Sequence, residues 1–227
     1  MKKYQLLLSL FVASTIVLSS FAQDKKVEFG VAAGWGYTMP RLKDSRTIQI
    51  PAIDAMNING FHAGPLLKLN INEMIGIQTG LLFNHFGGVN IDASQLALKK
   101  SSGNWYQSKT TLNTFDLPIR VVYSLTLAEG LNVLLFAGPN LNYAINKVST
   151  TEYYVSNNLN RSDVENNIYE SPSNFNALDL QMGVGVGIRY YGASIRAGYD
   201  WGLLNRTTYD NATLRSNDIK VTLGYTF

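Results

Sequence analysis

The chain contains no cysteine, and this absence excludes several kinds of protein. A disulfide-stabilised scaffold and a thiolate metal site both require cysteine, so neither is expected. Charged residues are also scarce, at 15% of the chain, and only two histidines occur. Beyond residue 22 no run approaches the roughly 18 consecutive apolar residues of a membrane-spanning helix, so no such helix is expected there.

The N-terminal segment has the pattern of a secretory signal peptide. Lys2 and Lys3 form a basic start, Leu6–Leu18 is an apolar core, and Ser20–Ala22 fits the small residues of a cleavage site. We therefore expect residues 1–22 to be removed after export. Removal of this segment takes away Lys2 and Lys3 and no acidic residue, so the net charge of the mature chain is close to zero. A nearly neutral chain gives no reason to expect nucleic acid as a partner.

What the sequence does contain is alternation between apolar and polar residues. It is clearest in Leu178–Tyr190 and Ala193–Leu203, where apolar residues alternate with glycines and charged residues, and Tyr191-Gly192 joins the two segments. Period-two alternation on both sides of a minimal turn is typical of a β-hairpin. A soluble sandwich would bury the apolar face in a core, whereas a membrane barrel would turn it toward lipid and line its lumen with the polar face.

The same alternation recurs along the chain and predicts eight strands. Short links follow the second, fourth and sixth strands, and long polar loops follow the others, at residues 38–59, 87–111, 146–177 and 205–216. This asymmetry, with strands of about 9–11 residues, is typical of outer-membrane barrels. The expected strands are Val27–Tyr37, Gly60–Asn70, Ile75–Phe86, Leu112–Tyr123, Asn132–Ile145, Leu178–Tyr190, Ala193–Leu203 and Asp218–Phe227.

Aromatic residues on the apolar parity lie near both ends of these strands, where two interfacial girdles are expected. Those near the long loops are Trp35, Tyr37, Phe61, Phe83, Phe115, Tyr143 and Trp201, and those near the short links are Phe29, Tyr123, Tyr190, Tyr225 and Phe227.

The opposite parity places equal numbers of acids and bases inside the predicted barrel. They are Glu28, Asp116, Asp179, Asp200 and Asp218, with Lys68, Arg120, Arg189, Arg196 and Lys220. An unpaired buried charge costs several kcal/mol, so we expect a structural network of ion pairs, with Asp200 bonded to Lys220. The balance of signs favours a filled lumen over an ion-selective pore.

The fold class predicted from these patterns is all-β: an eight-stranded antiparallel up-and-down transmembrane β-barrel at residues 23–227, preceded by a cleaved signal peptide. The expected location is the bacterial outer membrane, with outer-membrane lipids around the barrel.

An ordered set of segments resembles the PorT-type outer-membrane β-barrel family of Bacteroidota, often called the porin family. The resemblance implies an outer-membrane barrel and no single activity, although some members are tied to secretion-system assembly. The terminal alternation of Leu223, Tyr225 and Phe227 resembles the signal read by the barrel-assembly machinery, which would be a partner during insertion. The matching segments are GFHAGPLLKLNI, IGIQTGLLFNHFGG, FDLPIRVVYSL, LLFAGPNLNYAI, MGVGVGIRYYGASIRAGYDWGLLN and VTLGYTF.

Other motifs have simpler interpretations. The glycines at 183, 185 and 187 have phosphate-loop spacing but lie within a strand, so we expect them to relieve crowding in the lumen. Pro65 and Pro139 are expected at a bulge or a frayed strand end. His62 and His85, with Asp54 or Asp92, are the candidates for a catalytic or metal site, but metal sites usually need three or four ligands. We therefore predict no enzyme activity, catalytic residue, cofactor or metal.

The predicted role is structural or interaction-based, through extracellular loops that contact an unidentified surface or envelope protein. Four alternatives stay open: a narrow channel or porin, an enzyme acting on lipid or peptide at the outer rim, a secretion-system accessory barrel, and a soluble lipocalin-like barrel. The interior of an eight-stranded barrel is about filled by side chains, whereas aqueous porins have roughly 16–18 strands.

Overall fold

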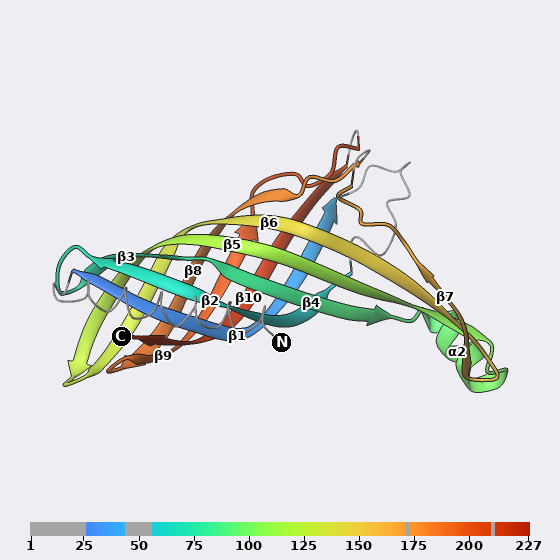
Figure 1. The fold of residues 1–227 in the computed structure, drawn as a ribbon, viewed down its shortest axis with the longest axis horizontal. Coiled ribbons are helices and arrows are strands. Elements are labelled where there is room, and N and C mark those ends of the chain that lie inside the picture. Colours follow the sequence, from blue (N-terminus) through green and yellow to red (C-terminus); the bar gives the residue numbers. More distant parts are fainter. Residues whose placement is uncertain (1–25, 44–55, 171–172, 210–211) are drawn as a thin grey trace, which may run out of the picture.

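The computed structural model describes residues 26–43, 56–170, 173–209 and 212–227, so the expected signal peptide lies outside the described residues. No helix in these ranges is long and apolar enough to cross a membrane. The elements are shown in Figure 1. They are β1 Val27–Lys43, β2 Ile58–Asn70, β3 Ile75–Gly80, β4 Leu82–Asn90, α2 Ala93–Ser101, β5 Trp105–Ala128, β6 Leu131–Val155, β7 Asn158–Val164, β8 Leu178–Tyr190, β9 Ala193–Gly202 and β10 Thr213–Thr226.

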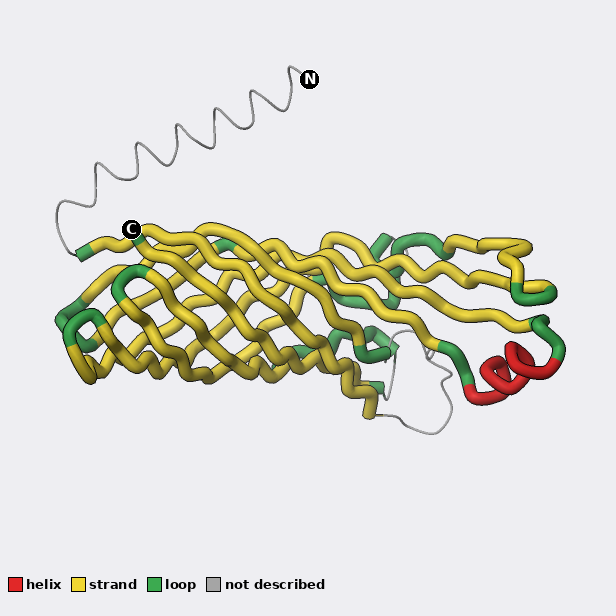
Figure 2. Tube along the Cα trace, turned by 90° about the horizontal axis from the view of Figure 1, so that it is seen from below, coloured by secondary structure: helices red, strands yellow, loops and turns green. Residues whose placement is uncertain are grey.

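The strands close into an antiparallel ring of eight crossings, as predicted. β3 and β4 together form one crossing between β2 and β5, and the ring continues through β6, β8, β9 and β10. β10 then pairs with β1 from Gly30 opposite Thr226 to Lys43 opposite Thr213, which leaves no free edge in the ring. Figure 2 shows the tilted strands winding around the barrel axis.

The two strand prolines interrupt the ladder without shifting its register, which differs from the expected bulge or frayed end. Pro65 lies opposite the break between β3 and β4, and β2 keeps one register on both sides, with Ala63 opposite Phe83 and Leu66 opposite Gly80. Next to Pro139, the Gly138 carbonyl turns from the ladder and accepts a hydrogen bond from Arg120. A proline lacks a ladder donor, so these positions lose pairing only locally.

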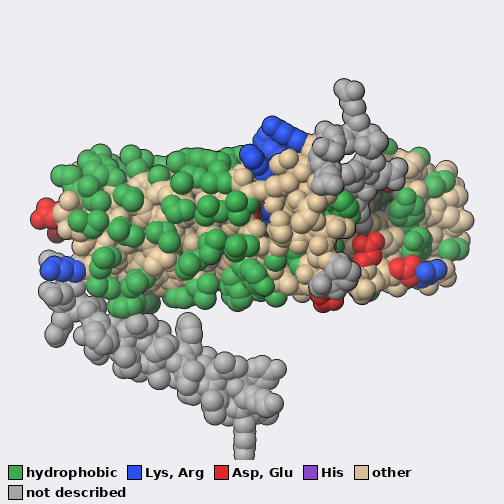
Figure 3. All heavy atoms as spheres, turned by 90° about the horizontal axis from the view of Figure 1, so that it is seen from above, with side chains coloured by type: hydrophobic (Ala, Val, Ile, Leu, Met, Phe, Trp, Pro, Cys, Tyr) green, Lys and Arg blue, Asp and Glu red, His purple; other side chains and the backbone are tan. Residues whose placement is uncertain are grey.

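The outer face of the barrel is an apolar belt. Figure 3 shows hydrophobic side chains covering most of one end of the molecule, with charged side chains at the margins of this belt on the face drawn. Aromatic residues pair at both rims: Phe83 packs edge-on against Phe115 at 5.7 Å between ring centroids, and Tyr225 packs on Phe227 at 5.4 Å. This is the arrangement predicted from parity, with the aromatic girdles at lipid-headgroup level.

All four predicted long loops are partly replaced by regular structure, and in the last of them β10 begins at Thr213. β5 begins at Trp105 and β6 runs to Val155, while α2 and β7 occupy positions expected to be loop, and β1 continues to Lys43. The parts beyond the barrel, residues 89–109 and 150–164, form one extension that we call the outer projection (Figures 1 and 2). The strand bounds predicted at this end are therefore wrong.

A β-bulge marks the base of the outer projection. Asn113 pairs with Asn146, but Thr114 pairs with Ala144, so Ile145 has no opposite residue. The inward side therefore changes from even to odd positions along β6: Asn142 is buried before the bulge and Lys147 is buried after it. Counting alternate residues along the barrel strands therefore predicts the wrong inward-facing residues beyond the bulge.

Candidate functional site: the lumen and the outer projection

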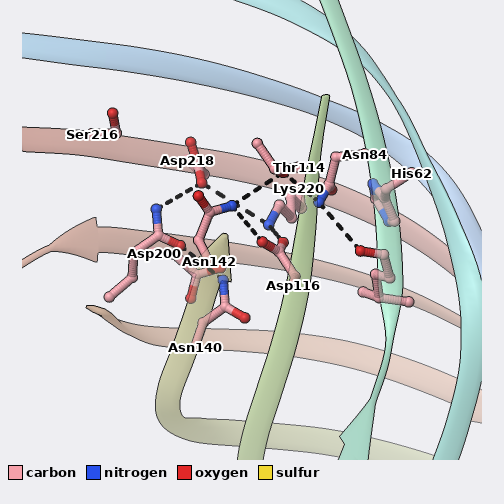
Figure 4. Close-up of polar contacts among 12 residues, drawn as sticks. His62, Asn84, Thr114, Asp116, Asn140, Asn142, Asp200, Ser216, Asp218 and Lys220 are labelled. Carbon is pink, nitrogen blue, oxygen red and sulfur yellow. Dashed lines mark hydrogen bonds and ion pairs between the residues drawn. The ribbon is translucent and has the colours of Figure 1, made fainter. Parts of the chain in front are cut away.

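A partly buried lysine, Lys220, and two buried aspartates occupy the middle of the lumen (Figure 4). Lys220 Nζ donates a hydrogen bond to Asp116 Oδ2 and lies 4.0 Å from Asp218 Oδ2. Amide groups complete the shell: Asn142 donates to Asp116 at 2.6 Å and Gln181 donates to Asp218 at 2.8 Å. One lysine thus faces two carboxylates, and each of these three ionic groups has a partner.

Asp200 does not bond to Lys220, so the predicted pair is wrong. Asp200 accepts a hydrogen bond from Arg120, and the ladder places Asp218 opposite Asp200 and Gly198 opposite Lys220. Arg120 belongs to β5, which is not a neighbour of β9 in the sheet. The side chain reaches its partner across the narrow lumen instead of along the barrel wall.

Four of the remaining charged residues lie toward the short-turn end, and the fifth, Asp179, lies at the long-loop end of β8. Glu28 accepts hydrogen bonds from Lys68 at 3.5 Å, Arg189 at 3.0 Å and Asn70 at 2.6 Å. Arg196 donates to the amide of Gln78 instead of to an acid. Asp179 is fully buried and forms no ion pair within the described part of the chain. Eight of the ten charged residues singled out in the sequence thus take part in ion pairs.

Neutral residues complete the lumen and were missed because only charged residues were counted. Gln181, Asn140, Asn84 and Thr114 are all at most 1% exposed and bond to one another or to the acids. Each lies on the inward parity of its strand, so the same alternation was sufficient to find them.

Side chains fill most of the lumen. The space between Asp116, Arg120, Phe136 and Lys220 amounts to a cavity of about 80 Å³, which has room for a few water molecules. Phe136 needs the glycines that face it, because a Cβ built on Gly185 would lie 2.1 Å from its ring. The predicted use of the strand glycines, relief of crowding, matches this geometry.

An apolar layer closes the lumen toward the outer projection. Ile58, Phe86, Leu112 and Ala144 pack together there, and Tyr169 covers them. The Tyr169 hydroxyl accepts a hydrogen bond of 2.6 Å from Arg206 Nη2. Polar network and apolar layer together obstruct the barrel along its axis.

The tip of the outer projection has its own polar cluster. Lys109 Nζ donates to Glu152 Oε1 at 2.6 Å, and Gln107 and the Tyr154 hydroxyl bond to Glu152 Oε2 at 2.7 and 2.9 Å. The hydrogen bond from Lys109, with those from Gln107 and Tyr154, lowers the pKa of Glu152 to about 2. The Trp105 ring stacks on Tyr154 with 4.0 Å between centroids and an angle of 4°. The cluster joins the facing ends of β5 and β6.

The two histidines point to opposite sides of the barrel wall. His62 Nε2 lies inside, 2.9 Å from Thr222 Oγ1, and His85 Nδ1 lies outside, 2.7 Å from Asn113 Oδ1. Asp54 is outside the described residues, and Asp92 immediately precedes α2. Among the residues that the structure describes, no three His, Asp or Glu side chains are grouped so as to hold a metal ion.

The family model for the outer membrane protein beta-barrel domain matches residues 21–207. The chain belongs to this family. As an outer-membrane β-barrel protein it is located in the bacterial outer membrane, surrounded by lipid, rather than free in the periplasm. No curated protein matches the chain.

Several solved structures are similar to this outer-membrane barrel in fold. Ail, the attachment invasion locus protein of Yersinia pestis, is 12% identical with a TM-score of 0.43, and the match covers 89% of this chain and 99% of Ail. Neisserial surface protein A is 10% identical with a TM-score of 0.40, covering 88% and 97% of the two chains. The outer membrane protease OmpT of Escherichia coli is 11% identical with a TM-score of 0.35, covering 88% and 97%.

Proposed function

We propose that this outer-membrane barrel is an interaction protein with a filled lumen that acts through its outer projection. The observation that carries the proposal is a contrast between the two halves of the molecule. The lumen is occupied by ion pairs, amides and an apolar layer. The outer projection instead exposes two strand ends, a hairpin and a helix beyond the apolar belt.

The expected membrane orientation and the proposed family support this role. Outer-membrane barrels carry their long connections on the cell surface, which puts the outer projection outside the cell. We propose residues 1–22 as the signal peptide, residues 23–227 as the barrel domain, and Leu223, Tyr225 and Phe227 as the signal for the barrel-assembly machinery. The ordered segments given above support membership of the PorT-type family of Bacteroidota. A surface or envelope protein is the proposed partner.

A non-enzymatic role is part of the same proposal. His62 and His85 lie on opposite faces of the wall and bond to Thr222 and Asn113, and neither forms an ion pair with a described carboxylate. Nucleophilic catalysis also requires a third group that orients the base, and His62 Nδ1, on the side of the ring away from the Thr222 hydroxyl, has no hydrogen-bond partner among the described residues.

Two measurements test the proposal. Purified protein in planar bilayers should give no steady, ion-selective conductance. Such a conductance would contradict the proposal that side chains fill the lumen. The second compares the wild type with a shortened variant in affinity capture from intact cells. The ladder allows clean joins, because Val89 pairs with Lys109 and Thr150 pairs with Val164, so a two-residue turn can replace residues 90–108 and 151–163.

The shortened variant keeps every barrel pairing and should insert normally, which heat-modifiable gel mobility will show. It should lose the surface components captured by the wild type. Capture of the same components by both proteins would contradict a role for the outer projection.

A further inference from the structure

We propose that the tip of the outer projection binds an acidic saccharide, a chain of sugar rings that carry carboxylate, sulfate or phosphate groups. This inference rests on the proposed function and adds a saccharide ligand to the protein partner proposed for the same outer projection. The site is an open pocket of about 580 Å³ between α2 and the ends of β5 and β6. That volume lies within the range of about 300–1,000 Å³ typical of small-ligand sites.

The pocket is positively charged. Lys99 and Lys100 come from the last turn of α2, and no acid lines the pocket. Neither lysine forms an ion pair with a described carboxylate, because the nearby Glu152 is held by Lys109. Two cations without a counter-charge in one concave site attract an anionic ligand.

An aromatic wall faces these lysines. Trp105 is only 7% exposed and is held between Tyr154, which stacks on it, and Lys99, whose Nζ lies 4.2 Å from the ring centroid. Its indole nitrogen donates a 2.9 Å hydrogen bond to Asn157 Oδ1. The wall is therefore rigid before a ligand arrives, which lowers the entropy lost on binding. Both faces of the Trp105 ring are already covered, so the aromatic surface open to a sugar ring is that of Tyr154, which lines the pocket and is partly exposed.

Two amide side chains supply unused hydrogen-bonding groups. The Gln107 amide nitrogen and the Asn157 amide oxygen are occupied, but Gln107 Oε1 and Asn157 Nδ2 have no hydrogen-bond partner among the described residues. One acceptor and one donor on the same wall fit the hydroxyl groups of a sugar. Cations, an aromatic wall and free amides together favour an acidic saccharide over a simple anion, which needs no aromatic wall.

The test uses full-length protein in detergent micelles and isothermal titration calorimetry. The probes are a chondroitin sulfate tetrasaccharide and a phosphorylated core oligosaccharide from lipopolysaccharide, which separate an external source of the ligand from the cell's own surface. Neutral chitotetraose and sodium sulfate are the controls. We expect at least one acidic oligosaccharide to bind, and both controls to bind at least tenfold more weakly.

The variant Lys99→Ala with Lys100→Ala should weaken this binding at least tenfold. The matched control is Arg41→Ala with Lys43→Ala, which removes the same charge from exposed positions at the outer end of β1 and should change the affinity less than twofold. Equal losses in both variants, equal binding of chitotetraose, or no binding of either acidic probe would overturn the site.

The result separates this inference from the proposed function. If the lysine variant still captures the surface components that the shortened variant loses, and wild type binds neither acidic probe, the saccharide site fails while the interaction role stands. If the shortened variant keeps all captured components, the interaction role itself fails.

Discussion

Lys220 holds two buried carboxylates, and its removal gives the first prediction. Lys220→Met would leave Asp116 and Asp218 buried without their cation. We expect the free energy of unfolding to fall by about 3–5 kcal/mol. A second substitution, Asp116→Asn, should recover much of the loss, because it removes one of the unpaired charges. Urea unfolding in detergent measures both effects in a double-mutant cycle.

The pairing seen in the structure provides the control for that cycle. Asp200 is bonded to Arg120, so Asp200→Asn should not rescue Lys220→Met and should add its own destabilisation. Strict additivity of Lys220→Met and Asp116→Asn, or rescue by Asp200→Asn, would contradict the observed network.

Gly183 occupies a position where no side chain fits. A Cβ at this residue would lie 1.7 Å from Asp200 Oδ1 and 2.8 Å from a guanidinium nitrogen of Arg120. Gly183→Ala should therefore displace the ion pair and lower the free energy of unfolding by about 1–3 kcal/mol. The matched control is Gly87→Ala, whose Cβ would have its nearest contact at 3.6 Å and should cost less than about 0.5 kcal/mol. Equal stability of the two variants in urea would show that the contact at Gly183 relaxes freely.

At the scale of the element, β10 closes the ring on both of its edges. Tyr225 pairs with Val31 of β1 and with Ala193 of β9. Deletion of Leu223–Phe227 should expose both edges and abolish assembly, with degradation in the periplasm. Outer-membrane fractionation and heat-modifiable mobility measure this outcome. Deletion of five residues from β7, at positions 158–162, is the control of equal length and should leave assembly intact; normal membrane levels of the C-terminal deletion would contradict a role for this strand end.

The strands within the apolar belt could be predicted because lipid on one side and a polar lumen on the other require alternation. Beyond the belt no lipid covers the outer face of the strands, so Trp105–Thr111 and Asn146–Val155 carry no apolar alternation and were predicted as loop. The bulge at Ile145 adds a reversal of parity there that no local pattern marks.

The lumen shows a second limit of prediction from the sequence. Alternation assigned Asp200, Arg120 and Lys220 to the inward face, and all three line the lumen cavity, but pairing was argued only between neighbouring strands. Arg120 on β5 reaches Asp200 on β9, and Lys220 on β10 reaches Asp116 on β5, because the lumen is narrow. Such contacts depend on the stagger of the whole ring, which the hairpin turns alone do not determine.

At the scale of the whole molecule, the two ends of the barrel should lie on opposite sides of the membrane. Epitope tags within Asn157–Glu170 should be accessible to antibody on intact cells, whereas tags at Ala128–Gly130 should become accessible only after permeabilisation. Flow cytometry with and without permeabilisation measures both. The reverse pattern would place the outer projection in the periplasm.

The length of β5 and β6 has a mechanical consequence. The two strands run from the short turn at Glu129 to the far tip, and antiparallel pairing joins them over most of this distance, interrupted next to Pro139 and at the bulge of Ile145. A load applied along the strands at the tip is therefore shared by many hydrogen bonds in shear, instead of opening them one after another. It passes directly into the barrel wall, with no flexible tether between. A ligand bound at the tip would be connected to the membrane through a stiff pair of strands that resists a pulling force.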